Sequence, residues 1–177
     1  MVMANISIRP AELSELDKIV DVHTQARTAY YRAGGLPEAN IDTADGAAQR
    51  RGGWARSIES GDKRVLCALH TGEVAGIVAM GPPLSSNAEA DTATVGELCQ
   101  IHVLPTHWGQ GIGSQLHATF VHYLHEAALP IGQVEAWDRN HRAQAFYLRH
   151  GWRPTGHRRQ GPDHCSYIRM RLNAVTA

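Results

Sequence analysis

The sequence of 177 residues contains few cysteines and no excess of either charge. The three cysteines, Cys67, Cys99 and Cys165, are widely separated and form no CxxC pair, so neither a disulfide framework nor a zinc knuckle is expected. Seventeen basic and seventeen acidic residues cancel, and a neutral chain lacks the positive field that non-specific nucleic-acid binding requires. We therefore expect a protein of the reducing cytoplasm with no nucleic-acid partner.

Long apolar runs are also missing from the sequence. No stretch approaches the roughly 20 apolar residues of a membrane helix, and the N-terminus lacks the charged and apolar regions of a secretion signal. No basic run is present that would bind an anionic membrane surface, so no membrane partner is expected. What is present is 43% hydrophobic residues over a length close to the roughly 150 residues of a typical domain, which predicts one packed domain over residues 1–177.

Hydrophobic periodicity predicts a mixed α/β fold around one sheet. Helices are expected from Pro10 through His23 and at 43–58, 112–128 and 141–149. Because Gly52 and Gly53 interrupt the polar 43–58 segment, we expect it to be a flexible cover over a cleft rather than core. Strands are expected at 6–9, 65–69, 74–80, 94–104, 133–137, 152–157 and 166–172.

A glycine-rich loop lies between the long strand ended by Pro105 and the helix that follows, with alternate glycines in residues 109–113. Glycine permits positive φ and a close approach of backbone to a ligand, and the first N–H groups of a helix have no intrahelical partner. The loop therefore predicts a phosphate or pyrophosphate cradle, with a simple reversing turn as the alternative. It is neither a Rossmann fingerprint nor a Walker A loop, because Leu116 stands at the third glycine position and Ser114 follows where lysine is needed.

Residues 108–113, Trp-Gly-Gln-Gly-Ile-Gly, resemble the acetyl-CoA-binding signature of the GNAT superfamily of N-acetyltransferases, Arg/Gln-x-x-Gly-x-Gly/Ala. The departure is Trp108, where the family prefers Arg or Gln; it affects a side-chain contact but not a cradle made of backbone N–H groups. The family's second signature, Asn-x-x-Ala-x-x-x-Tyr-x-x-x-Gly-Phe, is matched with Trp in place of Phe by Asn140, Ala143, Tyr147, Gly151 and Trp152.

The resemblance covers essentially the whole chain and implies the GNAT acyl-CoA N-acyltransferase fold, a mixed twisted central sheet of about six or seven strands flanked by about four helices. It implies acetyl-CoA as the acyl donor, no metal, and direct acetyl transfer within a ternary complex. In the family, backbone groups at Ile101, His102 and Val103 pair with pantetheine. The pyrophosphate would be held by Trp108, Gly109, Gln110, Gly111, Ile112, Gly113 and Ser114.

Two side chains of the second signature have implied roles on one helix. Asn140 stands at a favoured N-cap position, and the resemblance adds a hydrogen bond to the pantetheine arm. Tyr147 follows two helical turns later on the same face, and in the family this tyrosine protonates the departing thiolate. A phenol with a pKa of about 10 can protonate a thiolate whose acid has a pKa of about 8.5. The alternative is an aromatic ring that packs beside Phe146.

The general base has two candidates on the long strand. Glu97 precedes Gly111 by fourteen residues, the separation that the family's histone-acetylating branch uses for its basic glutamate. Its alternative role is a hydrogen bond to a neighbour or to the substrate ammonium. Simple alternation places Glu97 with Cys99 on one face and His102 on the other, but a bulge would reset this parity and keep His102 a candidate. Cys99 has no triad pattern around it and is expected to be a buried small hydrophobe.

The remaining polar clusters are weaker candidates. Three histidines on the helix after the glycine loop, His117, His122 and His125, lack a carboxylate partner and make a poor metal site. A histidine-dependent metal protein is kept only as a further hypothesis. The basic cluster of Arg149, Arg153, Arg158 and Arg159 predicts a solvated strand edge, or a contact to the CoA ribose phosphate or an acidic acceptor.

The acceptor is expected to be the primary amine of a small molecule, such as a polyamine, an amino acid or an aminoglycoside-like antibiotic. The first helices and the 82–93 loop would select it, and their acidic residues, Glu38, Asp42, Asp45, Glu89 and Asp91, could favour a cationic amine. The alternatives are a protein or peptide N-acetyltransferase and a non-catalytic acyl-CoA-binding regulatory module. A homodimer is compatible with the family.

Overall fold

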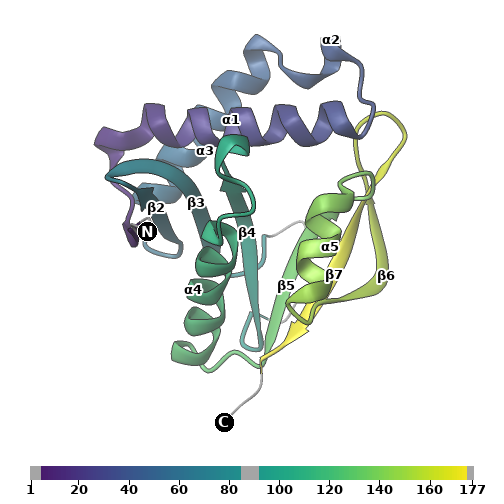
Figure 1. Cartoon of the computed structure of the whole chain (residues 1–177). Coiled ribbons are helices and arrows are strands. Elements are labelled where there is room, and N and C mark those ends of the chain that lie inside the picture. Colours follow the sequence, from purple (N-terminus) through teal and green to yellow (C-terminus); the bar gives the residue numbers. More distant parts are fainter. Residues whose placement is uncertain (1–4, 85–91, 175–177) are drawn as a thin grey trace.

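The computed structural model describes residues 5–84 and 92–174 and contains one seven-stranded sheet of order β1-β2-β3-β4-β5-β7-β6 (Figure 1). The expected mixed α/β fold with a central sheet is confirmed. The strands are β1 Ile6–Pro10, β2 Arg64–His70, β3 Glu73–Gly81, β4 Val95–Val103, β5 Ile131–Trp137, β6 Arg153–Gln160 and β7 Ser166–Asn173. The helices are α1 Leu16–Ala33, α2 Glu38–Ile41, α3 Ala44–Glu59, α4 Ile112–Glu126 and α5 His141–Arg149, with 3-10 turns at Leu13–Glu15 and Pro105–His107.

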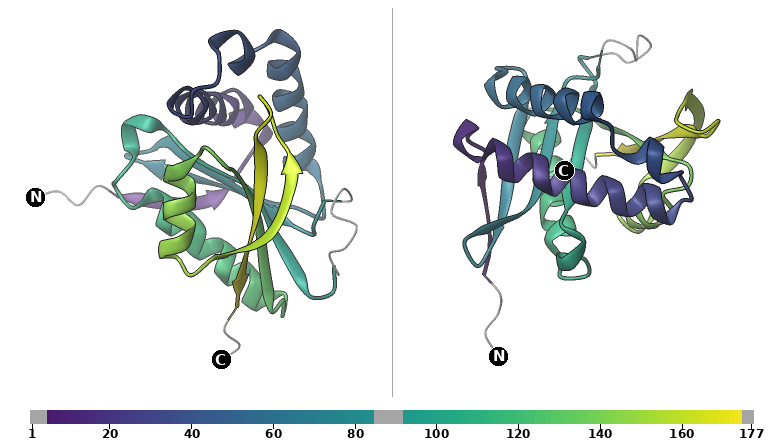
Figure 2. Two further views of the ribbon diagram at one scale, coloured as in Figure 1. Left: turned by 90° about the vertical axis from the view of Figure 1, so that its right-hand side faces the viewer. Right: turned by 90° about the horizontal axis from the view of Figure 1, so that it is seen from above.

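Helices cover both faces of the sheet and enclose separate parts of the core (Figure 2). Leu116 and Phe120 of α4 and Tyr147 of α5 pack on one face, where Phe120 is fully buried. Ile19 of α1 and Trp54 of α3 pack on the other face, over β2 and β3. The alternation of apolar residues along these strands explains how one sheet supplies two buried surfaces.

The sheet opens between its two central strands. β4 and β5 are parallel and pair only at their beginnings, where Val95–Glu97 lies beside Ile131–Gln133. Beyond these residues the strands diverge, so the two halves of the sheet separate towards the ends of β4 and β5 (Figure 1). Helix α1 crosses the open end of the sheet. Near the C-terminus of this helix, Tyr31 contacts Trp137 of β5, with ring centroids 4.7 Å apart.

Two expectations about the first helices are wrong. Pro10 does not open a helix; it ends β1, where it pairs with Leu66, and the long helix begins only at Leu16. Helix α3 continues through Gly52 and Gly53 and contributes Trp54, which is only 4% exposed, to the core. A helical glycine costs about 1 kcal/mol, which the burial of an indole offsets. The segment is therefore a helix that contributes to the core.

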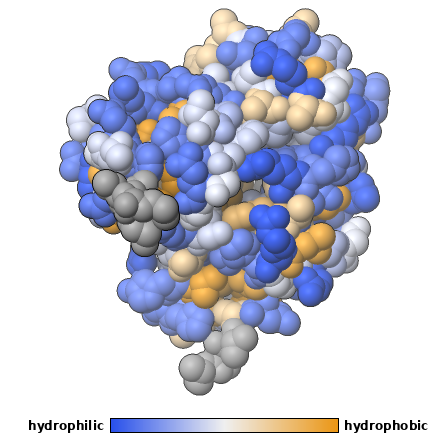
Figure 3. All heavy atoms as spheres, viewed as in Figure 1, coloured by the Kyte–Doolittle hydropathy of each residue, from blue (hydrophilic) through white to orange (hydrophobic). Residues whose placement is uncertain are grey.

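The surface carries no single large apolar face in the view of Figure 3, where hydrophobic residues form separate patches among hydrophilic ones. Leu13, Leu84 and Leu148 are the large hydrophobic residues exposed in the described part of the chain. Within residues 5–84 and 92–174, no helix combines the length and apolar character needed to cross a membrane.

Candidate active site

The divergence of β4 and β5 creates a cleft of about 940 Å³. Its walls come from both strands, the glycine loop, α5 and the middle of α1. The structure brings nearly all of the expected site residues to this cleft: Glu97, Ile101, His102, Val103, Trp108, Gly109, Gly111, Ile112, Gly113, Ser114, Asn140 and Tyr147. Gln110 is the exception, because its exposed side chain turns back to donate to the Thr106 carbonyl at 3.3 Å.

The glycine loop has the backbone geometry that its sequence predicted. Gly109 and Gly111 have φ of +77° and +85°, values that side chains with a Cβ rarely adopt. Gly111 is the N-cap of α4, and the buried Ile112 fixes the first turn of the helix in the core. The free N–H groups and the positive end of the helix dipole are therefore aimed into the cleft, where they can bind a phosphate group.

Trp108 has a local structural role that explains a residue other than Arg or Gln there. Its indole Nε1 donates to the Val103 carbonyl at 2.9 Å and so ties the loop to the end of β4. The Arg142 guanidinium lies 4.0 Å from the indole ring centroid, in a cation–π contact. Arg142 and Arg149 of α5 both line the cleft, so a positive charge is supplied from the neighbouring helix instead.

A β-bulge in β4 changes which side chains share a face. Gly81 is opposite Glu97 and Ala79 is opposite Gln100, but Cys99 has no opposing residue on β3. The extra residue resets the alternation, so Glu97 and His102 both point to the α1 face of the sheet. Simple alternation, which separated these two residues, is therefore wrong.

Glu97 is held at the bottom of the opening, where β4 and β5 still pair. Its residue is only 5% exposed, and its Oε2 accepts a hydrogen bond from the backbone N–H of Leu84 at 2.9 Å. The carboxylate is thus positioned by a segment that follows β3 while its residue still borders the cleft.

His102 lies in a stack of two imidazoles. Its ring lies over that of His23 of α1, with centroids 4.1 Å apart, and its Nε2 donates to Gln100 Oε1 at 2.6 Å. Burial, followed by the proximity of His23 and Arg27, holds the pKa of His102 well below its usual value. The ring is therefore neutral at neutral pH, with Nδ1 as a proton acceptor.

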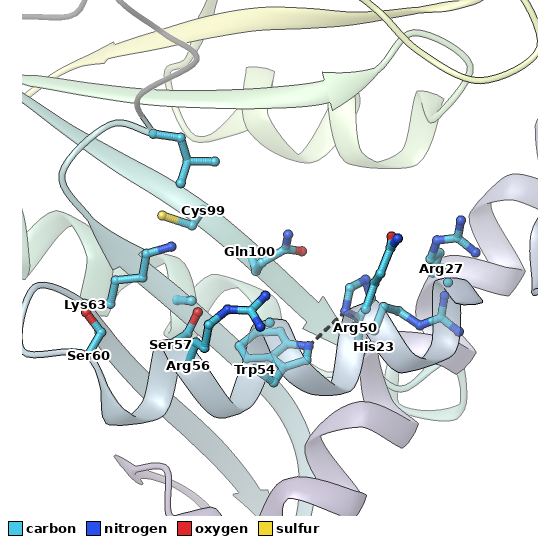
Figure 4. Close-up of a pocket in the computed structure, with 15 residues that line it drawn as sticks. His23, Arg27, Arg50, Trp54, Arg56, Ser57, Ser60, Lys63, Cys99 and Gln100 are labelled. Carbon is cyan, nitrogen blue, oxygen red and sulfur yellow. Dashed lines mark hydrogen bonds between the residues drawn. The ribbon is translucent and has the colours of Figure 1, made fainter. Parts of the chain in front are cut away.

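His23 lines the cleft and contacts Trp54, and neither residue was among the site residues expected from the sequence. The Trp54 indole N–H donates to His23 Nδ1 at 2.9 Å, which places the proton of the neutral imidazole on Nε2 (Figure 4). Burial, with the charges of Arg50 and Arg27, lowers the pKa of His23 to about 4. The only sequence signal was a histidine on the apolar side of a helix, which is more often a core residue than a site residue.

Tyr147 and Asn140 come from α5 and its N-cap. Burial raises the pKa of Tyr147, which is 4% exposed, so its hydroxyl stays protonated and can act as a donor. Within the described chain this hydroxyl makes no hydrogen bond, although the residue borders the cleft. Asn140 Oδ1 accepts from the Ala143 N–H at 3.1 Å, which confirms its capping role.

The thiol of Cys99 and the scattered histidines carry little chemistry. Burial raises the pKa of Cys99 to about 11, so little nucleophilic thiolate forms at neutral pH. His117 is buried and accepts from the Trp152 indole at 2.9 Å, while His122 pairs with Glu126 at 3.3 Å. Within the described ranges no group of three or more His, Cys, Asp or Glu side chains could hold a metal ion.

The comparison with family models decides the relationship. Residues 21–152 match the model of the acetyltransferase (GNAT) family. The chain belongs to this family. It is therefore an acetyltransferase. No match was found among curated protein sequences.

Solved structures share the fold of this GNAT acetyltransferase over nearly its whole length. PaiA N-acetyltransferase from Thermoplasma acidophilum, in complex with coenzyme A, is 16% identical and superposes with a TM-score of 0.74 over 96% of this chain and 99% of its own. The putative acetyltransferase YncA from Salmonella typhimurium, with acetyl-CoA, is 18% identical, with a TM-score of 0.68 over 98% and 96%. The ribosomal-protein-S18-alanine N-acetyltransferase from Escherichia coli gives the same identity, TM-score and coverage. The two cofactor complexes support acetyl-CoA as the acyl donor.

The charged clusters of the GNAT chain are partly neutralised. Arg159 pairs with Glu135 at 2.8 Å and Arg158 with Asp138 at 3.5 Å, on the exposed edge strand β6. The acidic residues expected near the acceptor are also paired: Glu38 with Arg32 at 2.5 Å, and Asp42 with Arg50. Asp45 is exposed on α3 and does not line the cleft, and Glu89 and Asp91 lie outside the described residues.

Proposed function

We propose that this acetyltransferase moves an acetyl group from acetyl-CoA to the primary amine of a small molecule, by direct transfer in a ternary complex. The observation that carries the proposal is the single cleft where β4 and β5 diverge, which brings Glu97, His102 and Tyr147 to common walls. A base, an acid and a route for an extended cofactor arm are the parts that such a transfer needs.

The donor would lie along the free edge of β4. Backbone groups of Ile101–Val103 have no strand partner on the β5 side and would pair with the amides of pantetheine. The Asn140 side chain would contribute from the start of α5, and the loop at 108–114 would hold the pyrophosphate. Arg142 and Arg149 at the cleft are suited to the remaining phosphate charge.

The chemistry needs one proton removed and one supplied. Glu97 would take a proton from the acceptor ammonium, directly or through a water, and the free amine would attack the thioester carbonyl carbon. The C–N bond forms, the C–S bond breaks, and its electron pair leaves on sulfur. Tyr147 would donate its phenolic proton to that thiolate, giving an N-acetylated product and CoA.

His102 is a second candidate for the base, because the bulge places it on the same face as Glu97. Its Nδ1 lone pair is available when Nε2 donates to Gln100. Burial holds the pKa of His102 below its usual value, so His102 is a weaker base than an ordinary imidazole.

Matched variants at the two positions test the proposal. Glu97→Gln preserves the acceptor oxygen for the Leu84 N–H but cannot take a proton, so kcat should fall about 100-fold, with partial recovery at high pH where the amine is already free. His102→Gln should have a smaller effect, and Glu73→Gln, an exposed carboxylate on β3, serves as the control. A larger loss in His102→Gln would transfer the base role to that residue, and full turnover in both variants would contradict the mechanism.

A broad screen with detection of released thiol separates the alternatives. Acetyl transfer to small amines supports the proposal, transfer only to peptides or proteins favours a protein N-acetyltransferase, and CoA binding without transfer favours a regulatory module. Action as one domain over residues 1–177 and a cytoplasmic location are parts of the same proposal, and the three free cysteines are compatible with a reducing compartment.

A further inference from the structure

We propose that the acceptor is an amine that also carries an anionic group, such as a carboxylate or a phosphorus acid, and that a cationic cavity beside the cleft recognises this group. The inference rests on the proposed acetyl transfer and names the substrate class for it. It replaces the expectation of a cationic amine such as a polyamine.

The cavity has a volume of about 610 Å³ and lies between α1, α3 and β4 (Figure 4). It borders the catalytic cleft directly, because both are lined by His23, Arg27, Leu84, Cys99 and Gln100. Two of these shared residues contact the proposed bases: the His23 ring stacks on His102, and the Leu84 N–H donates to the Glu97 carboxylate. A small amine bound here can therefore present its nitrogen to the base while the rest of the molecule occupies the cavity.

The lining of this cavity carries four positive side chains and, among the described residues, no carboxylate. The cations are Arg27 of α1, Arg50 and Arg56 of α3, and Lys63, which directly precedes β2. This is an uneven distribution in a chain whose basic and acidic residues are equal in number. A concave site with one sign of charge attracts ligands of the opposite sign.

Two of the cations have no ion pair with any described carboxylate. Arg56 and Lys63 form no salt bridge within residues 5–84 and 92–174, and Figure 4 shows both among the residues around the cavity. They are free to bind the anionic group of a ligand, and the fork of an arginine suits a carboxylate or a phosphorus acid.

Arg50 is the buried cation of the set. Its side chain is only 9% exposed, and although one end pairs with Asp42, its Nε is buried without a hydrogen-bond partner in the described structure. A buried guanidinium N–H without a partner is costly, and a ligand oxygen in the cavity would satisfy it. Its charge, with that of Arg27, already reaches the site, since both lower the pKa of His23.

The test compares matched amines that differ only in the anionic group. L-amino acids are measured against their carboxamides, with 2-aminoethylphosphonate as the phosphorus acid, putrescine and spermidine as cationic amines, and short acidic peptides as an alternative source of the same charge. We expect kcat/KM for the best amino acid or phosphonate to exceed that of its uncharged analogue about ten-fold or more, and to fall with added salt. A preference for the carboxamides or polyamines would overturn the inference, and a preference for peptides would replace the small acceptor with a chain terminus.

A double variant locates the recognition in the cavity. Arg56→Gln combined with Lys63→Gln should raise KM for the anionic amine about ten-fold or more without changing KM for acetyl-CoA. Arg51→Gln is the matched control, because Arg51 is on the same helix but outside the cavity lining, where it pairs with Asp17. Equal effects of the two changes, or none, would contradict the assignment.

Calorimetry on the CoA-saturated protein separates this inference from the proposed reaction. If anionic amines bind and the double variant weakens that binding, the cavity assignment stands even when no amine is acetylated, and the proposed function falls alone. If carboxamides are acetylated as well as acids, the proposed function stands and the inference falls. If no anionic amine binds or reacts, the inference is wrong.

Discussion

The proposed donor cleft and the proposed acceptor cavity would recognise their ligands by different means. The cleft uses backbone: Gly109 and Gly111 with positive φ, the N-terminus of α4 and the free edge of β4. The cavity uses side chains, with cations brought together from α1, α3 and the residue before β2. Backbone recognition depends on a few local glycines, whereas side-chain recognition depends on the packing of distant segments. A shared cofactor can thus be kept while the acceptor site varies.

The largest effect expected on the donor side comes from Tyr147→Phe. Removal of the phenolic proton donor should lower kcat by two to four orders of magnitude, the usual contribution of general acid catalysis, while KM for both substrates changes little. Steady-state kinetics with both substrates varied provide the measurement. Tyr123→Phe is the control, since Tyr123 is on α4 and does not line the cleft. Unchanged turnover in Tyr147→Phe would remove its acid role.

Acid should destabilise both regions to a similar extent. His23 beside the acceptor cavity and His117 near the donor loop are both buried, each accepts from an indole, and each has its pKa lowered to about 4 by burial first. In the unfolded chain each histidine has a pKa near 6.5 and is protonated below that pH. Between pH 6.5 and pH 4 the native state therefore binds fewer protons than the unfolded state, and the free energy of unfolding decreases as the pH falls. At pH 4 each histidine should lower the free energy of unfolding by about 3 kcal/mol relative to neutral pH.

Thermal unfolding followed from pH 7 to pH 4 checks this expectation. The Tm should be nearly flat above pH 6.5 and fall below it, and His117→Gln should reduce the slope because the amide oxygen still accepts from Trp152 but does not titrate. The same slope in the variant would show that His117 does not contribute. A similar change in His23→Gln would show that the two regions share this property.

A smaller effect, confined to the donor, is expected from Gly111→Ala. A Cβ at φ +85° strains the loop and moves the N–H groups that are proposed to bind the pyrophosphate, so KM for acetyl-CoA should rise about ten-fold while KM for the amine stays the same. Gly35→Ala is a close control, because Gly35 has φ +81° with no atom near the added Cβ and lies outside the cleft. Equal changes in both variants would attribute the effect to lost stability alone.

The sequence predicted the local geometry of the glycine loop and of the Asn140 cap more fully than the arrangement of side chains around the second cavity. The glycines of 109–113 and the Asn140 cap act locally, so their spacing carried the information. The cavity could not be found this way, because Arg27, Arg56 and Lys63 belong to different elements and each looks like a solvated charge in the sequence. The length of α1 and the continuity of α3 were also missed, since tertiary packing of Trp54 outweighs two helical glycines.

The face shared by Glu97 and His102 depends on a β-bulge, and no residue type in the sequence indicates that bulge. The bulge arises where β3 pairs with β4: β4 has one more residue, Cys99, than the part of β3 that lies opposite it. Sequence alternation alone therefore misplaced Glu97 relative to His102, while the possibility of a bulge kept both as candidates.

This bulge makes Cys99 an extra residue of β4, so neither its identity nor its presence decides which face Glu97 occupies. A small side chain of another type can occupy the unpaired position without moving its neighbours. Removal of Cys99 would leave Glu97 two positions before Gln100, on the face that carries Gln100 and His102, whereas removal of two residues would turn Glu97 to the opposite face. A deletion of one residue in the middle of β4 should therefore be tolerated in variants of this enzyme where a deletion of two residues is not.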